Sequence, residues 1–384
     1  MFKPQLKALQ CTRWRAVLAM FSLLLACGRP LHADSFVLPT DGSTVVGAPR
    51  IIIPTQDNTL LDIARQLDVG YHEITWANPG VDVWLPEKNV KVTVPTQYVL
   101  PPKPWTGIVV NISQRRLFYF PVPAKGQPAK VITFPVSIAR EGWATPLGMT
   151  KVAGMHKDPA WFVPKSIQAE HKAAGEIEFP EYFPPGPDNP MGMLAIQLGF
   201  PGIFIHGTNR PWGVGMRTSH GCLHLYPEDA AAIFPLVTAG VQVRVIDEPV
   251  VVGLQEGQLF LASYEPVEEY GTTKDLTTRA ALALTPYLQA AVQPRTDLHT
   301  PEKKSSAKQG SANEKAKAAS LPPPVVYPVD WQKVLALTTK PQVIPVSIDP
   351  KGKSLDAVLE GVSPDLYDYP PYGIDANDAS MPGQ

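Results

Sequence analysis

Three histidines and one cysteine gather in one short stretch, HGTNRPWGVGMRTSHGCLHL, which runs from His206 to Leu225. The stretch also holds four glycines and no acidic residue. A thiol of ordinary pKa is mostly protonated near neutral pH, so it becomes a nucleophile when a nearby imidazole accepts its proton. These residue types therefore indicate nucleophilic catalysis, with Cys222 as the nucleophile and His206 as its base.

The spacing of the stretch also predicts how these side chains meet. His206 ends the apolar run GIFIH, which is typical of a strand, and the turn PWGVG then brings SHGC back beside it. We expect Gly221 to allow close approach of the backbone, so that amides near Cys222 point at a developing oxyanion. Because no acidic residue can orient His206, a backbone carbonyl is expected to do so, and Gly207 is the first candidate.

A zinc site is an alternative for the same side chains. Imidazole and thiolate are zinc ligands, and the stretch offers four of them: His206, His220, Cys222 and His224. Structural zinc sites normally use paired, closely spaced cysteines, and the chain has no Cys-x-x-Cys. The nucleophile is the favoured interpretation, and we expect no metal or other cofactor.

The start of the chain has the pattern of a signal peptide. Residues 1–33 combine a basic segment, a short apolar core and a cleavage point at Ala33, which predicts export by a signal peptide. The run LLAC ending at Cys27 loosely resembles a lipobox, so a lipid anchor on Cys27 is an alternative. Cleavage after Ala33 leaves Cys222 as the single thiol, which is either buried and inert or kept for its reactivity.

The whole chain is large enough for several domains. It has 384 residues, of which 44% are hydrophobic, and a net charge of −1. Such a charge gives no basic field for nucleic acid, so no nucleic-acid partner is expected. The segments below predict the elements that position the Cys-His stretch.

Residues 51–95 predict a strand, two helices and a strand, with Thr59 as the N-cap of the first helix. The segments DNTLLDIA, ITWANPGVD and VTVP resemble a LysM module, a small βααβ domain that binds glycans containing N-acetylglucosamine. The resemblance implies glycan strands as partners. The alternative is an accessory helical hairpin without a binding role.

Residues 104–248 read as short strands and one clear helix, YPEDAAAIFPLVTAG, with Pro227 in its first turn. The long proline-rich segment 155–192 is predicted to be a loop that acts as a lid over a cleft. Beyond this domain, residues 249–295 predict a hairpin and a helix, and residues 296–324 a disordered linker. The extension 325–384 is expected to return as a helix and a strand against the hairpin, with a loose acidic end.

The segment HGTNRPWGVGMRTSHGC resembles the signature of the L,D-transpeptidase (YkuD-type) family. The likeness extends through REGWATPLGMTKV, DPAWFVP and GPDNPMG to VQVRVID, and it is closest to the periplasmic branch that contains a LysM module. It implies a mainly β fold: a β-sandwich-like catalytic domain, a small βααβ LysM-like domain and a small C-terminal α+β extension.

The resemblance also implies a role for single residues. The catalytic set would be the nucleophile and base with the residues that shape the turn and the oxyanion site: Cys222, His206, His220, Gly221, Ser219 and Gly207. The substrate-binding set would be Arg217, Trp212, Asn209 and His224. Relatives usually carry Arg or Asn where this chain has His224, so recognition of the substrate's end departs from the family pattern.

The function implied is transpeptidation of peptidoglycan stem peptides through a Cys222 thioester, with release of the terminal D-Ala. The acceptor would be an amine of another stem or a lysine of an envelope lipoprotein, and water would make the enzyme an L,D-carboxypeptidase. Carbapenem-type β-lactams would be covalent inhibitors. Two other classes remain as alternatives: a non-catalytic LysM cell-wall binder, and a papain-like endopeptidase, in which Cys normally precedes His.

Overall fold

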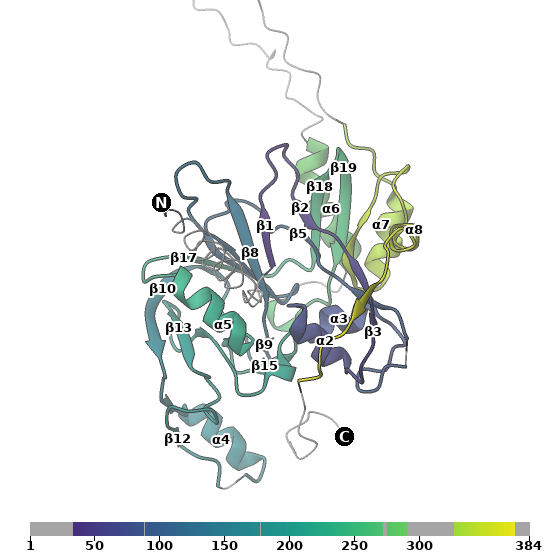
Figure 1. Cartoon of the computed structure of the whole chain (residues 1–384). Helices are drawn as coiled ribbons and strands as arrows, with labels where there is room; N and C mark the ends of the chain where they lie inside the picture. Colours follow the sequence, from purple (N-terminus) through teal and green to yellow (C-terminus); the bar gives the residue numbers. More distant parts are fainter. Residues whose placement is uncertain (1–33, 88, 177, 272–274, 290–325, 373–384) are drawn as a thin grey trace, which may run out of the picture.

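The computed structural model describes residues 34–87, 89–176, 178–271, 275–289 and 326–372 (Figure 1). The predicted signal peptide (1–33) and linker (296–324) lie outside these residues. No helix in the described part is long and apolar enough to cross a membrane.

A nine-stranded sheet forms the largest part of the fold. Its strand order is β1-β8-β7-β6-β17-β10-β13-β14-β16. In chain order these strands are β1 (Asp34–Val37), β6 (Gly107–Asn111), β7 (Arg116–Phe120), β8 (Lys130–Pro135), β10 (Gly148–Lys157), β13 (Leu194–Leu198), β14 (Phe204–His206), β16 (Leu223–His224) and β17 (Gln242–Ile246). The prediction of a mainly β domain is confirmed.

The sheet changes direction at β10. The first half of this strand pairs with β17 and the second half with β13, and the register shifts between Val152 and Gly154. Such a bulge bends a strand. One apolar core then collects side chains from both ends of the sheet and from α5 (Pro227–Ile233), the helix that the sequence predicts. Figure 1 shows α5 lying across the strands of this half.

The predicted small unit has the expected order of elements. It consists of β3 (Arg50–Pro54), α2 (Leu60–Gln66), α3 (Tyr71–Ala77) and β4 (Val92–Val94). Thr59 caps α2 as predicted, because its side chain accepts the backbone N–H of Asp62. The inward faces of both helices and strands share a second apolar core.

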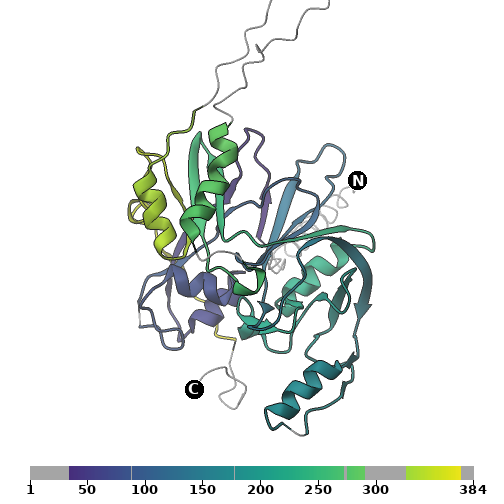
Figure 2. The ribbon, with the colours of Figure 1, turned by 180° about the vertical axis from the view of Figure 1, so that it is seen from behind.

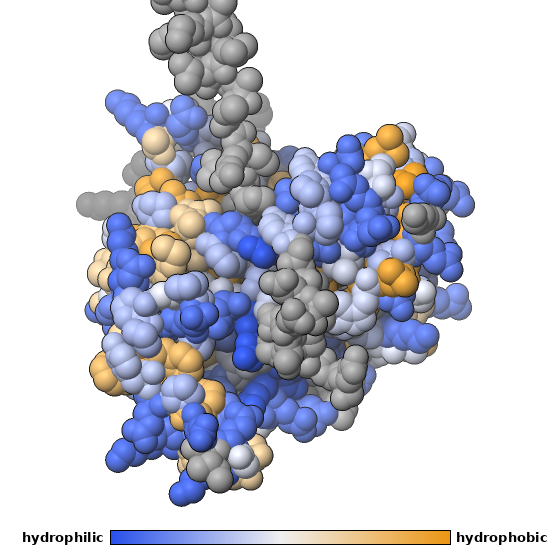
Figure 3. Space-filling view, turned by 60° about the horizontal axis from the view of Figure 1, so that its bottom comes forward, coloured by the Kyte–Doolittle hydropathy of each residue, from blue (hydrophilic) through white to orange (hydrophobic). Residues whose placement is uncertain are grey.

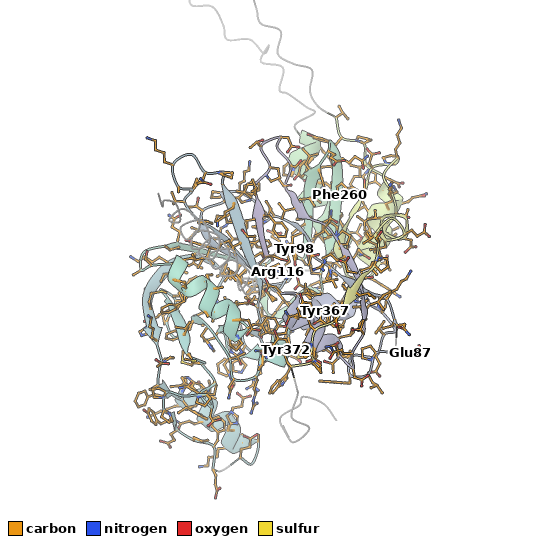
Figure 4. The ribbon with its side chains drawn as sticks, viewed as in Figure 1. Glu87, Tyr98, Arg116, Phe260, Tyr367 and Tyr372 are labelled. Atoms are coloured by element: carbon orange, nitrogen blue, oxygen red, sulfur yellow. The ribbon has the colours of Figure 1, made fainter. Side chains whose placement is uncertain are left out.

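The acidic chain end is not loose up to residue 372, so that expectation is wrong there. Strand β21 (Asp365–Tyr367) pairs in parallel with β3, and Tyr367 is 3% exposed in the core of the small unit. Figure 4 shows Tyr367 and Tyr372 beside α2 and α3. This burial of an aromatic side chain holds the segment in place.

The C-terminal part forms a third packed unit beside the nine-stranded sheet and the small unit (Figure 2). The hairpin of β18 (Val250–Gln255) and β19 (Gln258–Ser263) gains β20 (Gln342–Ser347) as a third strand, and α6 (Leu276–Gln289) and α7 (Trp331–Thr339) pack on it. In this structure a helix and a strand from the C-terminal extension thus lie against the hairpin.

The proline-rich segment is not only a loop. It contains β11 (Trp161–Phe162), α4 (Lys165–Ala173) and β12 (Tyr182–Phe183), which project from the lower edge of the molecule in Figure 1. The segment KSIQAEHKA begins after Pro164 and consists mostly of good helix formers, so local propensity favours α4 despite the flanking prolines. Figure 3 turns the bottom of the molecule forward and shows hydrophilic residues interrupting small apolar patches on this face.

Candidate active site

Two neighbouring strands bring the Cys-His stretch together. β14 and β16 run in parallel, with Ile205 opposite Leu223 and His206 opposite His224. Cys222 directly precedes β16 and so stands two residues before His224 in the chain. The His224 ring in turn lies 4.5 Å from the His206 ring. The turn between the strands thus returns the segment that follows Cys222 to the side of the strand that ends at His206.

His206 is held as a buried, neutral imidazole. Its side chain is 5% exposed, and its Nδ1 lies 2.6 Å from the carbonyl oxygen of Gly207. Burial lowers the pKa of His206 to about 4, although the Gly207 and Met191 carbonyls oppose this shift. The Gly207 carbonyl favours the tautomer that carries hydrogen on Nδ1, and in that tautomer Nε2 is the nitrogen that can accept a proton.

Cys222 is half-buried, with Sγ 3.6 Å from the carbonyl oxygen of Gly202. Burial raises the pKa of this thiol to about 11, and the backbone of Phe204 opposes the rise. The free protein therefore holds a thiol rather than a thiolate at neutral pH. Both pKa shifts favour an uncharged thiol and imidazole over an ion pair.

The turn before Cys222 is fixed by Ser219 and Gly221. Ser219 Oγ donates to the Cys222 carbonyl at 2.5 Å and accepts the Gly221 N–H at 3.1 Å. Gly221 has φ +121°, and a Cβ there would lie 3.0 Å from Ile203 Cδ1. Thr145 Oγ1 donates to the Gly221 carbonyl at 2.8 Å. These contacts support the shape of the turn, and they occupy the Gly221 amide with Ser219.

His220 contacts two charged residues that the sequence analysis does not single out. Its Nε2 lies 2.5 Å from Arg140 Nη2 and 3.0 Å from Glu170 Oε2, and Arg140 and Glu170 also form an ion pair. Burial and the charge of Arg140 lower the pKa of His220. Trp143 meets the His220 ring edge-on at 4.8 Å. Glu170 lies on α4, so the proline-rich segment 155–192 reaches the residue two positions before Cys222.

His224 is partly buried and lies beside the expected base. Burial lowers the pKa of His224 well below its ordinary value, and the neighbouring His206 and His220 act in the same direction. A neutral ring packed 4.5 Å from His206 restricts where that imidazole can turn. The geometry thus places His224 next to the base, although the resemblance implies a substrate contact.

The three other residues expected to contact substrate are held by parts of the protein itself. Arg217 Nη2 pairs with Glu269 Oε1 at 2.5 Å, which compensates the charge expected to attract an anionic peptide. Asn209 donates to the carbonyl of Asp188 at 3.0 Å, at the returning end of the lid. Trp212 belongs to the turn η1 (Pro211–Gly213).

The small unit braces the turn that links the two strands. The Tyr71 N–H at the start of α3 donates to the Val214 carbonyl at 2.9 Å. Gly215 has φ +88°, and a Cβ there would lie 2.5 Å from Tyr71 N and 2.7 Å from Gly70 Cα. The active-site turn and α3 therefore approach as closely as two backbones can.

Arg140 and Glu170 are two charged residues beside His220 that could not be assigned to the site from the sequence. A sequence indication for Arg140 is that it is the first residue of REGWATPLGMTKV, a segment that resembles the family. Glu170 gave no signal beyond its place in the lid. Among the described residues, no three His, Cys, Asp or Glu side chains are arranged to hold a metal ion.

The site thus combines a mainly β fold, a buried imidazole at the end of β14 and a thiol directly before the neighbouring strand β16. The family model for the L,D-transpeptidase catalytic domain matches residues 106–252, against the expected 104–248. Three relatives from Escherichia coli (strain K12) extend the match beyond this domain. "Probable L,D-transpeptidase YbiS" is 38% identical over 253 residues, which cover 65% of this chain and 80% of the relative.

"Probable L,D-transpeptidase YcfS" is 36% identical, covering 67% of this chain and 81% of the relative, and "Probable L,D-transpeptidase ErfK/SrfK" is 35% identical, covering 72% and 88%. The chain belongs to the L,D-transpeptidase family. A solved structure of L,D-transpeptidase 3 from Mycobacterium tuberculosis, in complex with a faropenem-derived adduct, is 18% identical to this chain. The match has a TM-score of 0.27 and covers 57% of this chain and 99% of that chain.

Proposed function

We propose that the protein is a periplasmic, cysteine-dependent L,D-transpeptidase that acts on peptidoglycan stem peptides. The observation that supports this function best is the pairing of β14 with β16. It brings the segment that directly follows Cys222 beside the strand that ends at His206, a buried imidazole whose Nδ1 faces the Gly207 carbonyl. A binding protein has no need of this arrangement, which favours an enzyme over a non-catalytic wall binder.

The reaction follows from the uncharged state of the pair. His206 Nε2 takes the thiol proton as Sγ attacks the carbonyl of the third stem residue, so that charge forms only during the step. The imidazolium then gives its proton to the leaving amine, and D-Ala departs. An acceptor amine then attacks the thioester and His206 removes its proton. The new amide forms as the Cys222–acyl bond breaks, and the imidazolium returns the proton to sulfur, so that Cys222 is again a thiol.

The choice of acceptor defines the alternatives within this proposal. An amine of a second stem peptide gives a cross-link, a lysine of an envelope lipoprotein gives an attached protein, and water gives an L,D-carboxypeptidase. We further propose that residues 51–95 bind glycan strands and that residues 1–33 direct export, with a lipid anchor on Cys27 as the alternative. We also propose that carbapenem-type β-lactams acylate Cys222, because they would react with the same thiol as the acyl donor.

The test of the proposed function is a Cys222→Ala variant assayed with a tetrapeptide donor and a stem-peptide acceptor. Release of D-Ala and formation of cross-linked product should both fall by at least about 10³-fold, because the covalent route is lost. The mass of the product separates a cross-link from a hydrolysed tripeptide and so identifies the acceptor. Near-normal turnover by the folded variant would disprove the mechanism.

A further inference from the structure

Arg140, His220 and Glu170 form a cluster next to the proposed nucleophile. The Glu170 carboxylate meets both the Arg140 guanidinium and His220 Nε2. His220 is two residues from Cys222 in the tight turn that Ser219 closes. Whatever binds to Arg140 and His220 therefore lies close to the reacting sulfur.

The carboxylate in this cluster comes from a separate element that is weakly attached. Glu170 lies on α4, where Ile167 is the only buried side chain. The side chains of Arg140 and Glu170 are 35% and 39% exposed, and ion pairs at such exposure add little to stability. A competing carboxylate could replace Glu170 at small cost.

The cluster also has unused capacity to bind an anion. Within the described part of the chain, Arg140 Nε is buried and has no hydrogen-bond partner. A guanidinium binds a carboxylate best when two of its N–H groups act together. In addition, a neutral His220 can either accept from Arg140 or donate to Glu170 through Nε2, but not both. With Glu170 bound, at least one N–H donor of this cluster, Arg140 Nε, therefore lacks an acceptor among the described residues.

We propose that Arg140 and His220 form a carboxylate subsite for the acyl donor, and that Glu170 of the lid occupies it in the free protein. This inference rests on the proposed function, in which the donor ends in a free carboxylate one residue beyond the attacked carbonyl. Arg140 binds that carboxylate and aligns the scissile bond with Cys222, and Glu170 withdraws. Arg217, the arginine favoured by the sequence, keeps its ion pair with Glu269.

Alkylation of Cys222 tests the subsite without requiring transpeptidation. Iodoacetate carries a carboxylate and iodoacetamide is its neutral analogue, so the ratio of their rates reports an anion site beside the thiol. The Cys222 peptide is followed by mass spectrometry in the full chain. Glu170→Gln removes the competing charge and should raise the iodoacetate-to-iodoacetamide ratio by about 3-fold or more. Glu176→Gln is the matched control, because Glu176 pairs with His171 in the same lid.

Arginine variants complete the test. Arg140→Gln should lower the iodoacetate-to-iodoacetamide ratio by about 10-fold, since hydrogen bonds to a charged group are lost. The ratio for Arg140→Lys should lie between those of Arg140→Gln and the wild type. Arg217→Gln should leave the ratio unchanged. If Arg140→Gln does not fold, Arg140→Lys and Glu170→Gln still decide the result. A ratio that neither of these variants alters, or that Glu170→Gln lowers, would overturn the proposal.

Donor peptides connect the subsite to the reaction. For a tetrapeptide that ends in a carboxylate, Arg140→Lys should raise KM more than it lowers kcat. For the same peptide with a C-terminal amide, the variant and the wild type should have the same KM. An equal effect on both donors would show that Arg140 only supports the fold of the lid, and so would contradict the proposal. Absence of turnover in the wild type would instead refute the proposed function and leave the alkylation result standing.

Discussion

At the scale of single residues, the uncharged state of Cys222 and His206 is the central feature. Burial raises the pKa of the thiol to about 11 and lowers that of the imidazole to about 4. A protonated imidazole cannot accept a proton, so a low pKa keeps His206 available as a base throughout the neutral range. The same burial makes the thiol depend on that base, because little thiolate forms without it.

His206→Ala should therefore lower kcat by about 10² to 10⁴, the usual contribution of a positioned proton acceptor. His224→Ala should lower kcat by less than about 10², because His224 packs beside the base and takes no part in the proposed proton transfers. Steady-state kinetics with one donor peptide measures both. Equal losses at the two positions would contradict the assignment of His206 alone as the base.

The sequence identified the residues of this site that lie within one local motif. Cys222, His206 and the supporting turn could be predicted because they fall within 17 residues. Arg140 and Glu170 could not, because they approach His220 from 80 and 50 positions away in the chain. The sequence also did not show that Glu269 pairs with Arg217, since that contact requires the folded chain.

At the scale of elements, the turn between β14 and β16 depends on α3. Gly215→Ala should disturb this contact, because its Cβ would lie 2.5 Å from Tyr71 N. Gly240→Ala is the matched control, since Gly240 also has a positive φ but open space at its Cβ. Both variants carry the conformational strain, so Gly215→Ala should lose about 1 to 3 kcal/mol more in the free energy of unfolding.

Kinetics provides a second measurement on the same two variants. Because the turn sets the approach of Cys222 to His206, Gly215→Ala should also lower kcat, and Gly240→Ala should not. Equal stability and equal kcat in the two variants would show that the small unit does not brace the active-site turn.

The elements with a regular hydrophobic period were predictable, and two others were not. Helix α5 and the βααβ order follow from periodicity and from caps such as Thr59. Helix α4 was missed because prolines on both sides of it favoured a loop. Strand β21 was missed because its partner, β3, lies more than 300 residues earlier, and no local pattern reports such pairing.

At the scale of the whole molecule, a buried ion pair joins the small unit to the nine-stranded sheet. Arg116 of β7 is 0% exposed, and its Nε and Nη2 both lie 2.8 Å from the carboxylate oxygens of Glu73 in α3. Its guanidinium also lies over the Tyr98 ring at 4.1 Å, and Figure 4 shows the two near the centre of the molecule. Deleting residues 51–95 would leave Arg116 unpaired, so surface substitutions are the better test of glycan binding.

Glu73→Gln should lower the free energy of unfolding by about 3 to 5 kcal/mol, because it leaves a buried arginine without its counter-charge. The control is Asp365→Asn, which breaks the exposed pair with Arg50 and should cost at most about 1 kcal/mol. Urea unfolding measures both values. A Glu73→Gln variant as stable as the control would show that the pair does not couple the two parts.

The most direct test of the central claim is the mass of the Cys222 peptide during the reaction. The protein is mixed with a tetrapeptide donor in the absence of an acceptor amine, quenched in acid and digested. The account predicts that the Cys222 peptide gains the acyl group of the donor without its terminal D-Ala, and that hydroxylamine removes this group. Release of D-Ala from a donor while Cys222 stays unmodified at every time point would contradict the thioester mechanism.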